Sequence, residues 1–428
     1  MQKVLIIAYY WPPAGGPGVQ RWLKFVTYLR DFNIEPVVYV PENPSYPIVD
    51  TSFVNEIPDG IKIYKHKINE PYGWASFLSK NKTKKISSGL IQSKNQSVIE
   101  KILLWVRGNF FIPDARKNWV KPSVNYLSSI LVEEQINTII TTGPPHSVHL
   151  IGLKLKDKLG VNWVSDFRDP WTSIGYHKKL RLSKSSAKKH KYLEHLVLNS
   201  ADSIIVTSNT TKKEFIEITD KPVEVITNGF DGAISSGVAL DAMFTISHIG
   251  SLLTGRNPEN LWQALSELCN ENEAFKNSLS LQFIGVVSED VLETIYKYNL
   301  KSYVNLIGYV SHTEALAYQE KSQVLLLSEI DSADTIGIIA GKLFEYMRAK
   351  RPILAIGPKG WEVSTIIKET NTGVAFNYND TSNLKSLLLD WFYKYQTKKL
   401  NVNSTNINTY SRKERTAKLA NHLYGYRI

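Results

Sequence analysis

The chain has 428 residues, 43% of them hydrophobic, and a formal net charge of +11 at pH 7. This length supports two hydrophobic cores, so we expect two domains. The single cysteine, Cys269, excludes a disulfide framework and a cysteine-based metal site. No apolar stretch reaches the roughly 20 residues of a transmembrane helix, and a cytoplasmic protein is therefore expected.

Strands and helices alternate along the whole chain, which is typical of parallel sheets in α/β domains. The strands expected in the first half are residues 4–9, 35–40, 137–141, 162–166, 203–207 and 223–226. Those expected in the second half are residues 244–249, 281–284, 304–307, 324–327, 352–356 and 373–376. Residues 228–243 contain several glycines and serines and show no periodicity, so they are predicted to link two doubly wound sheets.

Glycines follow the first predicted strand in the segment YYWPPAGGPGVQRW. Gly15 and Gly16 let the backbone approach a ligand closely, and a helix that begins near Val19 would point its amino end at the same place. The GxGxxG spacing of dinucleotide-binding proteins is absent. A simple glycine turn is the alternative interpretation.

Positive charge is concentrated in two segments of the first half. Residues 74–125 carry ten basic and two acidic side chains, and residues 178–191 carry seven basic and no acidic ones. With the interleaved Trp105, Phe110 and Phe111, these segments suit an anionic membrane surface or a phosphate-bearing acceptor rather than nucleic acid. The alternative is a solvated lysine-rich surface. Residues 77–97 are expected to be a poorly ordered insertion.

Two further strand ends in the first half carry polar side chains. His146 lies at a strand-to-helix junction in TTGPPHSVH and could donate to a sugar hydroxyl, whereas a structural role is expected for His149. Asp166 and Asp169 flank Arg168 in VSDFRDPW, where carboxylates serve binding or acid/base chemistry. A network that only braces this loop is the alternative for both aspartates.

The second half offers two loops suited to phosphate. In HIGSLLTGRNPENL, Arg256 is expected to face the ligand crevice, with Asn257 as a helix cap and Pro258 as the first helical residue. In GIIAGKLFEYMRAKRP, Lys342 and Glu345 share one helix face and could bind a diphosphate and a ribose. A surface arginine and a solvated Lys/Glu pair are the alternatives.

Together these motifs resemble GT-B glycosyltransferases of glycosyltransferase family 4, over nearly the whole chain. The resemblance is carried by Gly15 and Gly16, by TNGFD at residues 227–231, by the loop from Gly250 to Arg256 and by KLFEYMRAKRPILA. It implies two Rossmann-like domains that face a central cleft. Residues 1–230 with a C-terminal helix over 411–428 would form the acceptor side, and residues 231–410 would bind the nucleotide-sugar.

The resemblance also implies roles for individual residues. Glu345 would bind the ribose, Arg256 and Lys342 would neutralise the donor diphosphate, and His146 would contact the transferred sugar. The remaining expected donor contacts are Gly15, Gly16, Gly250, Ser251, Gly337 and Leu343. Two positions depart from the family pattern, because Gly337 stands where a first glutamate is usual and Ser251 where a basic residue is usual.

The function expected is that of a retaining hexosyltransferase that moves a sugar from a nucleotide-sugar to a glycan or lipid-linked acceptor in surface polysaccharide biosynthesis. No metal is expected, since cationic side chains replace an Asp-x-Asp motif, and peripheral binding to the inner membrane face is a further expectation. An inverting enzyme would instead use Asp166, Asp169 or His146 as its base. A nucleotide-sugar epimerase or hydrolase would fit the same fold, and so would a non-catalytic binding partner, which Gly337 favours.

Overall fold

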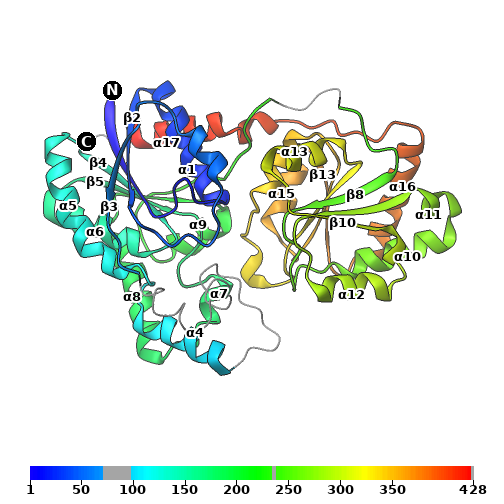
Figure 1. The fold of residues 1–428 in the computed structure, drawn as a ribbon, viewed down its shortest axis with the longest axis horizontal. Helices are drawn as coiled ribbons and strands as arrows, with labels where there is room; N and C mark the ends of the chain where they lie inside the picture. The colour runs from blue at the N-terminus through cyan, green and yellow to red at the C-terminus, as the bar shows by residue number, and fades with distance from the viewer. Residues whose placement is uncertain (71–97, 234–237, 426–428) are drawn as a thin grey trace. The chain divides into compact units, whose positions relative to one another are not determined.

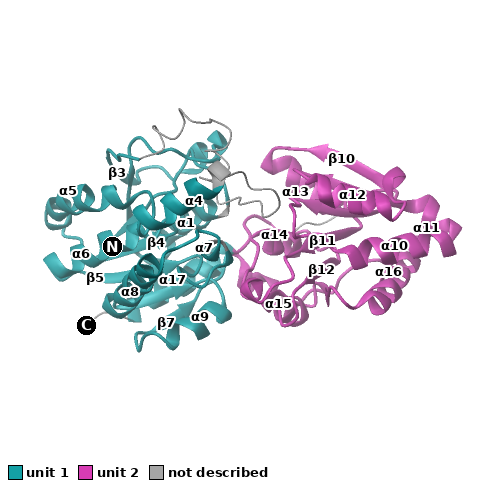
Figure 2. Ribbon diagram, turned by 90° about the horizontal axis from the view of Figure 1, so that it is seen from below, with its two compact units in different colours: residues 1–228, 412–428 teal, residues 229–411 magenta. Residues whose placement is uncertain are grey.

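The computed structural model describes residues 1–70, 98–233 and 238–425, and these form two compact units. Unit 1 comprises Met1–Asn228 and Arg412–Ile428, and unit 2 comprises Gly229–Ser411 (Figure 2). Each unit contains a parallel β-sheet with helices on both faces (Figure 1). The predicted fold class of two doubly wound α/β domains is confirmed. The insertion expected at residues 77–97 lies outside the described residues.

The sheet of unit 1 has seven strands among the described residues, in the order β3-β2-β1-β4-β5-β6-β7. All neighbours are parallel, and Val4 of β1 lies opposite Pro36 of β2 and Thr138 of β4. The strands are β1 (Gln2–Ala8), β2 (Ile34–Pro41), β3 (Lys62–His66), β4 (Thr138–Gly143), β5 (Asn162–Phe167), β6 (Ser203–Val206) and β7 (Val223–Val225).

Strand β3 was not predicted from the sequence. It is an edge strand whose residues are exposed or half-buried, so it lacks the continuous apolar run that marks a buried parallel strand. Its Tyr64 hydroxyl donates to Glu134 Oε1 at 2.7 Å, which ties the edge to the end of helix α5 (Val120–Glu133).

Alternate residues of β1 point to opposite faces of this sheet. Leu5 and Ile7 belong to one core cluster with side chains of α5, α6 and α8, whereas Val4 and Ile6 belong to another with side chains of α1 and α17. Two apolar faces explain why β1 is an uninterrupted apolar run from Val4 to Ala8. The other helices of unit 1 are α1 (Pro17–Leu29), α4 (Val98–Phe110), α6 (Ser147–Leu159), α7 (Gly175–Lys178), α8 (Lys184–Ser200), α9 (Asn209–Ile216) and α17 (Arg412–Gly425).

Helix α17 returns the end of the chain to unit 1, where it packs along α1. Its first residue, Arg412, donates to the Gln20 side chain at 2.7 Å and to the Gln20 carbonyl at 2.9 Å. Leu419 and Leu423 are fully buried in the same core cluster as Trp22 of α1. Burial of these leucines therefore holds the C-terminal segment in the first unit.

The sheet of unit 2 has six strands among the described residues, all parallel, in the order β10-β9-β8-β11-β12-β13. They are β8 (Phe244–Ile249), β9 (Leu279–Ile284), β10 (Val304–Gly308), β11 (Val324–Ser328), β12 (Ile353–Gly357) and β13 (Gly373–Asn377). The strands expected in this half of the chain agree with these within one or two residues at each end.

Two core clusters also cover the two faces of the second sheet. One contains side chains of α10, α12 and α16, and the other contains side chains of α14 and α15 with Tyr318 of α13 packed against it. The helices of unit 2 are α10 (Glu259–Glu271), α11 (Glu273–Ser278), α12 (Glu289–Lys297), α13 (His312–Lys321), α14 (Lys342–Arg348), α15 (Glu362–Thr370) and α16 (Thr381–Gln396).

The cap predicted for α10 is wrong. Helix α10 begins at Glu259, directly after Pro258, and no side chain caps it. The Asn257 side chain instead accepts from Trp262 Nε1 at 2.7 Å and donates to Thr294 at 2.8 Å. The buried N–H of Trp262 needs an acceptor, so the Asn257 side-chain oxygen binds this N–H and does not cap the helix.

Candidate functional site

The carboxyl edge of the second sheet brings several predicted donor residues together. Gly250 follows β8 with φ at +101°, and a Cβ there would lie 2.9 Å from Lys342 Nζ. A Cβ at Gly285, which follows β9, would lie 2.7 Å from the Gly250 carbonyl oxygen. Both positions need glycine, because any side chain would strain the backbone and displace its neighbour.

The Lys342 amine reaches this edge from the first residue of α14. Its Nζ lies 3.1 Å from Nε2 of the buried His248, whose Nδ1 lies 3.0 Å from the Leu326 carbonyl oxygen. His248 therefore donates through Nδ1 and accepts the amine proton through Nε2. No carboxylate among the described residues forms an ion pair with Lys342. Burial, reinforced by Arg256, lowers the pKa of Lys342 to about 7.

Arg256 was predicted to face a ligand crevice, and the structure also gives it a carboxylate partner, Glu329. Its Nε and Nη2 donate to the two carboxylate oxygens of Glu329 at 2.9 and 3.1 Å. The Glu329 side chain is 2% exposed and that of Arg256 is 34% exposed. The pair uses two of the five guanidinium N–H donors, so Arg256 retains donors for a ligand while its charge is balanced.

Glu345 points its carboxylate toward α13. Its Oε2 accepts from Gln319 Nε2 at 3.0 Å, and its Oε1 lies 3.3 Å from His312 Nε2. Gln319 is fully buried, and its amide oxygen has no hydrogen-bond partner within the described part of the chain. The two members of the predicted Lys342/Glu345 face thus have different neighbours, the amine beside β8 and the carboxylate beside α13.

The remaining predicted donor contacts of unit 2 lie around the same loops. Ser251 is exposed, and Gly337 is half-buried between the short 3₁₀ helix Ala333–Thr335 and α14. The Leu343 side chain belongs to the core, and its backbone N–H donates to the Ala340 carbonyl at 3.0 Å. Leu343 is therefore engaged in holding the start of α14.

In unit 1 the glycine segment lies close to the end of β5. Gly16 has φ at +106° and directly precedes α1, and Gly15 donates to the Ile48 carbonyl at 3.0 Å. A Cβ at Gly18 would collide with the Arg168 guanidinium. Arg168 in turn donates to the carbonyl oxygens of Gly143 and Pro144. Glycine at position 18 lets the arginine of the second loop pack against the start of α1.

The two aspartates predicted as acid/base candidates have opposite environments. Asp166 is fully buried and accepts from Arg21 Nη2 at 2.9 Å, Trp22 Nε1 at 2.8 Å and the Thr142 hydroxyl at 2.8 Å. Asp169 is half-buried, and its carboxylate has neither a hydrogen bond nor an ion pair with the described residues. Burial raises the pKa of Asp169. Asp166 thus braces α1 against β4 and β5, and Asp169 is the carboxylate available to a ligand.

His146 and His149 are both buried aromatic neighbours in unit 1. His146 stacks on Trp171 with 4.7 Å between ring centroids, and neither of its ring nitrogens has a hydrogen-bond partner among the described residues. His149 Nδ1 lies 2.8 Å from the Thr141 hydroxyl. Burial lowers the pKa of His149 to about 3 and that of His146 well below its usual range. Both rings are neutral at pH 7, and both nitrogens of His146 are buried.

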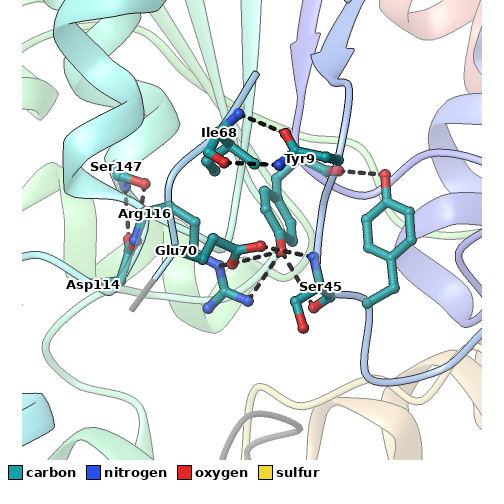
Figure 3. A network of polar contacts seen from close by, with 9 residues as sticks. Tyr9, Ser45, Ile68, Glu70, Asp114, Arg116 and Ser147 are labelled. Atoms are coloured by element: carbon teal, nitrogen blue, oxygen red, sulfur yellow. Dashed lines mark hydrogen bonds and ion pairs between the residues drawn. The ribbon is translucent and has the colours of Figure 1, made fainter. Parts of the chain in front are cut away.

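A polar network that the sequence did not reveal anchors the helix next to His146 (Figure 3). The Asp114 carboxylate accepts from the backbone N–H of Ser147 at 2.8 Å and from its hydroxyl at 2.9 Å, at the start of α6. Close by, Arg116 Nε lies 2.9 Å from Glu70 Oε1, which also accepts from the Tyr9 hydroxyl at 2.8 Å. These contacts fix the loop that carries His146, and they bury Arg116, which the sequence had placed in a surface patch.

Two kinds of arrangement are absent from the part of the chain that the structure describes. Within those ranges, no three His, Cys, Asp or Glu side chains are grouped so as to hold a metal ion. None of the described helices combines the length and apolar character needed to span a bilayer.

Solved structures of other proteins share the fold of this chain. Anabaena HepE in complex with UDP and glucose has a TM-score of 0.61 at 12% identity, covering 99% of this chain and 100% of that one. Sucrose-phosphate synthase from Thermosynechococcus elongatus has a TM-score of 0.59 at 14% identity, with 100% of both chains covered. The lipopolysaccharide outer core galactosyltransferase WaaB in its apo form also has a TM-score of 0.59, at 13% identity with 100% of both chains covered.

The fold is therefore that of the GT-B glycosyltransferases. Over residues 92–233 the sequence also matches the model of Glycosyltransferase Family 4. The resemblance indicated by the sequence motifs is confirmed. No curated protein matches the sequence significantly.

Proposed function

We propose that this chain is a retaining glycosyltransferase that moves a sugar from a nucleotide-sugar to a glycan or lipid-linked acceptor in surface polysaccharide biosynthesis. The observation that carries the proposal is the Lys342 amine beside Gly250, next to Arg256 and without a carboxylate partner among the described residues. A cation held in this way favours an anionic ligand such as a diphosphate. The complexes of HepE with UDP and glucose support this class of donor.

On the donor side, we assign Lys342 and Arg256 to the diphosphate and Glu345 to the ribose hydroxyls. Gln319 and His312 orient the Glu345 carboxylate, and an oriented carboxylate can accept from a pair of neighbouring hydroxyls. Glu329 fixes the guanidinium fork of Arg256, and His248 fixes the Lys342 amine. Gly337 supplies no carboxylate, so backbone groups near it would meet the sugar.

In the proposed reaction, the bond between the anomeric carbon and the diphosphate oxygen breaks while the acceptor oxygen bonds to the same face of the sugar. The acceptor proton passes to the departing phosphate oxygen. Negative charge on the diphosphate grows as the bond breaks, and Lys342 and Arg256 stabilise it. This route requires neither a protein base nor a metal.

On the acceptor side, we assign His146 and Asp169 to sugar hydroxyls. His146 is neutral, so it can donate through one ring nitrogen and accept through the other. Asp169 would be the base if the reaction inverted the anomeric centre, because Asp166 is saturated by Arg21, Trp22 and Thr142.

Three measurements on the purified protein, made one after another, test the function. A thermal-shift panel of UDP-, GDP-, dTDP- and CMP-sugars identifies the donor, because a ligand of the folded state raises Tm. We then expect nucleotide release that depends on an added acceptor, and a product with the donor's anomeric configuration by NMR. Turnover without acceptor would indicate an epimerase or hydrolase, and donor binding without any turnover would indicate a non-catalytic binding protein. An inverted product would contradict retention.

Donor affinity should fall as pH rises above about 7. Burial holds the pKa of Lys342 at about 7 in the free protein, so the amine is neutral above that pH and must take up a proton to meet a diphosphate. Because donor binding takes up one proton, donor affinity should fall by up to about tenfold for each pH unit above this pKa. Calorimetry with a nucleotide-sugar at a series of pH values on both sides of this pKa checks the prediction. A Lys342→Met variant should lose the dependence, and a wild-type affinity that stays constant over the series would contradict the assigned role.

A further inference from the structure

Helix α4 presents an apolar face to solvent in unit 1. Ile102, Trp105 and Phe110 are 55, 44 and 59% exposed, and the rings of Trp105 and Phe110 are in edge contact at 5.6 Å. The buried side of the helix carries Leu104 and Gly108, where a Cβ on Gly108 would lie 2.6 Å from Leu182. The helix thus packs through one side while large apolar groups on another side stay in water, which marks an interaction surface.

The basic segment 178–191 lies directly beside this face. Asn109 of α4 donates to the Arg181 carbonyl at 3.2 Å and accepts from the Ser183 backbone N–H at 2.8 Å. These bonds join α4 to the turn that precedes α8, and both helices lie in the same part of unit 1 (Figure 1). Charge and apolar surface are therefore neighbours in the folded unit and not only in sequence.

All seven basic residues of this segment are exposed, and they are Lys178, Lys179, Arg181, Lys184, Lys188, Lys189 and Lys191. Lys184, Lys188 and Lys191 follow the four- and three-residue spacing of one helical stripe. The opposite side of α8 is buried through Ser186, His190 and Glu194. The buried side fixes the orientation of the helix, so the lysine stripe is held toward solvent.

We propose that the exposed face of α4 and the basic segment 178–191 form a docking surface for a membrane that contains anionic lipids. Lysines attract anionic headgroups, and Ile102, Trp105 and Phe110 are of the types that enter the headgroup region. A second copy on the same surface would bring two strongly basic segments together, which opposes self-association. The surface lies in unit 1 and does not depend on the proposed donor site.

Vesicle sedimentation of the full chain tests the surface. The protein should sediment with vesicles that contain phosphatidylglycerol, should not sediment with pure phosphatidylcholine, and should be released by added salt. Replacing Lys184, Lys188 and Lys191 with glutamine should weaken binding at least about tenfold. The control replaces the exposed Lys368, Lys398 and Lys399 of unit 2 with glutamine, which removes the same charge and should leave binding within about twofold.

Tryptophan fluorescence tests the apolar part. Among the tryptophans that the structure describes, only Trp105 is exposed, so anionic vesicles should shift the emission to shorter wavelength and Trp105→Phe should abolish the shift. Ile102→Ser with Phe110→Ser should weaken binding without lowering Tm. Equal binding to both vesicle types, binding to neither, equal loss in the two lysine triples, or self-association through α4 would overturn the proposal. Thermal shift with nucleotide-sugars reads the donor site separately.

Discussion

Replacing Lys342 with methionine is expected to lower turnover at saturating donor by about 10²- to 10³-fold, the range for removing one stabilising donor from a developing anion. The amine lies beside Gly250 and bonds only the neutral His248 among the described residues, so its charge is available to the diphosphate. Methionine keeps the length and apolar character of the stem. Steady-state and single-turnover kinetics with the nucleotide-sugar measure the effect.

The matched control is Lys350→Met, an exposed lysine just beyond the same helix. It should retain turnover within about twofold, because the charge of a solvated surface lysine is screened. A second comparison is His248→Phe, which removes the acceptor of the amine and should reduce turnover by less than loss of Lys342 itself. Near wild-type turnover in Lys342→Met would require another cation at the diphosphate.

Replacing Asp166 with alanine is expected to destabilise unit 1 by about 3 to 5 kcal/mol, because it leaves the charge of Arg21 buried without its partner. The Arg21 and Asp166 side chains are 2 and 0% exposed, and the same carboxylate also accepts from Trp22 and Thr142. Hydrogen exchange of β1 and β5 amides measures the loss, with the amides of β8 and β11 as an internal reference in unit 2.

Asp169→Asn separates the structural from the chemical role. Asp169 has no hydrogen-bond or ion-pair partner among the described residues, so its replacement should change stability by less than about 0.5 kcal/mol. For a retaining enzyme it should reduce turnover through acceptor binding alone. Unchanged exchange protection in Asp166→Ala would show that the carboxylate does not brace α1, and would return Asp166 to the acid/base candidates.

The charge around Gly250 also bears on Ser251, one of the two departures from the family pattern. Ser251 supplies no positive charge after the glycine, and Lys342 brings its amine to the same glycine from α14. Arg256 is neutralised by Glu329, so Lys342 is the cation whose charge no described carboxylate pairs with. We infer that Lys342 compensates for the serine.

The sequence by itself determined the fold class. Central parallel strands are buried on both faces and can therefore be recognised as short apolar runs, as in residues 324–327, which form most of β11. The edge strand β3 lacks this signal. The sequence analysis did not single out His248 or Glu329, which the structure shows to be the partners of Lys342 and Arg256.

Only the tertiary structure decided those partners. The pairs Arg256–Glu329 and Lys342–His248 join residues 73 and 94 positions apart, and Arg21–Asp166 joins residues 145 apart. Local periodicity reports which face of an element is buried, but it contains no information on which distant side chain meets a buried charge. The order of the strands in the parallel sheets decides which side chains come into contact, because it aligns the carboxyl ends of strands that lie far apart in the chain.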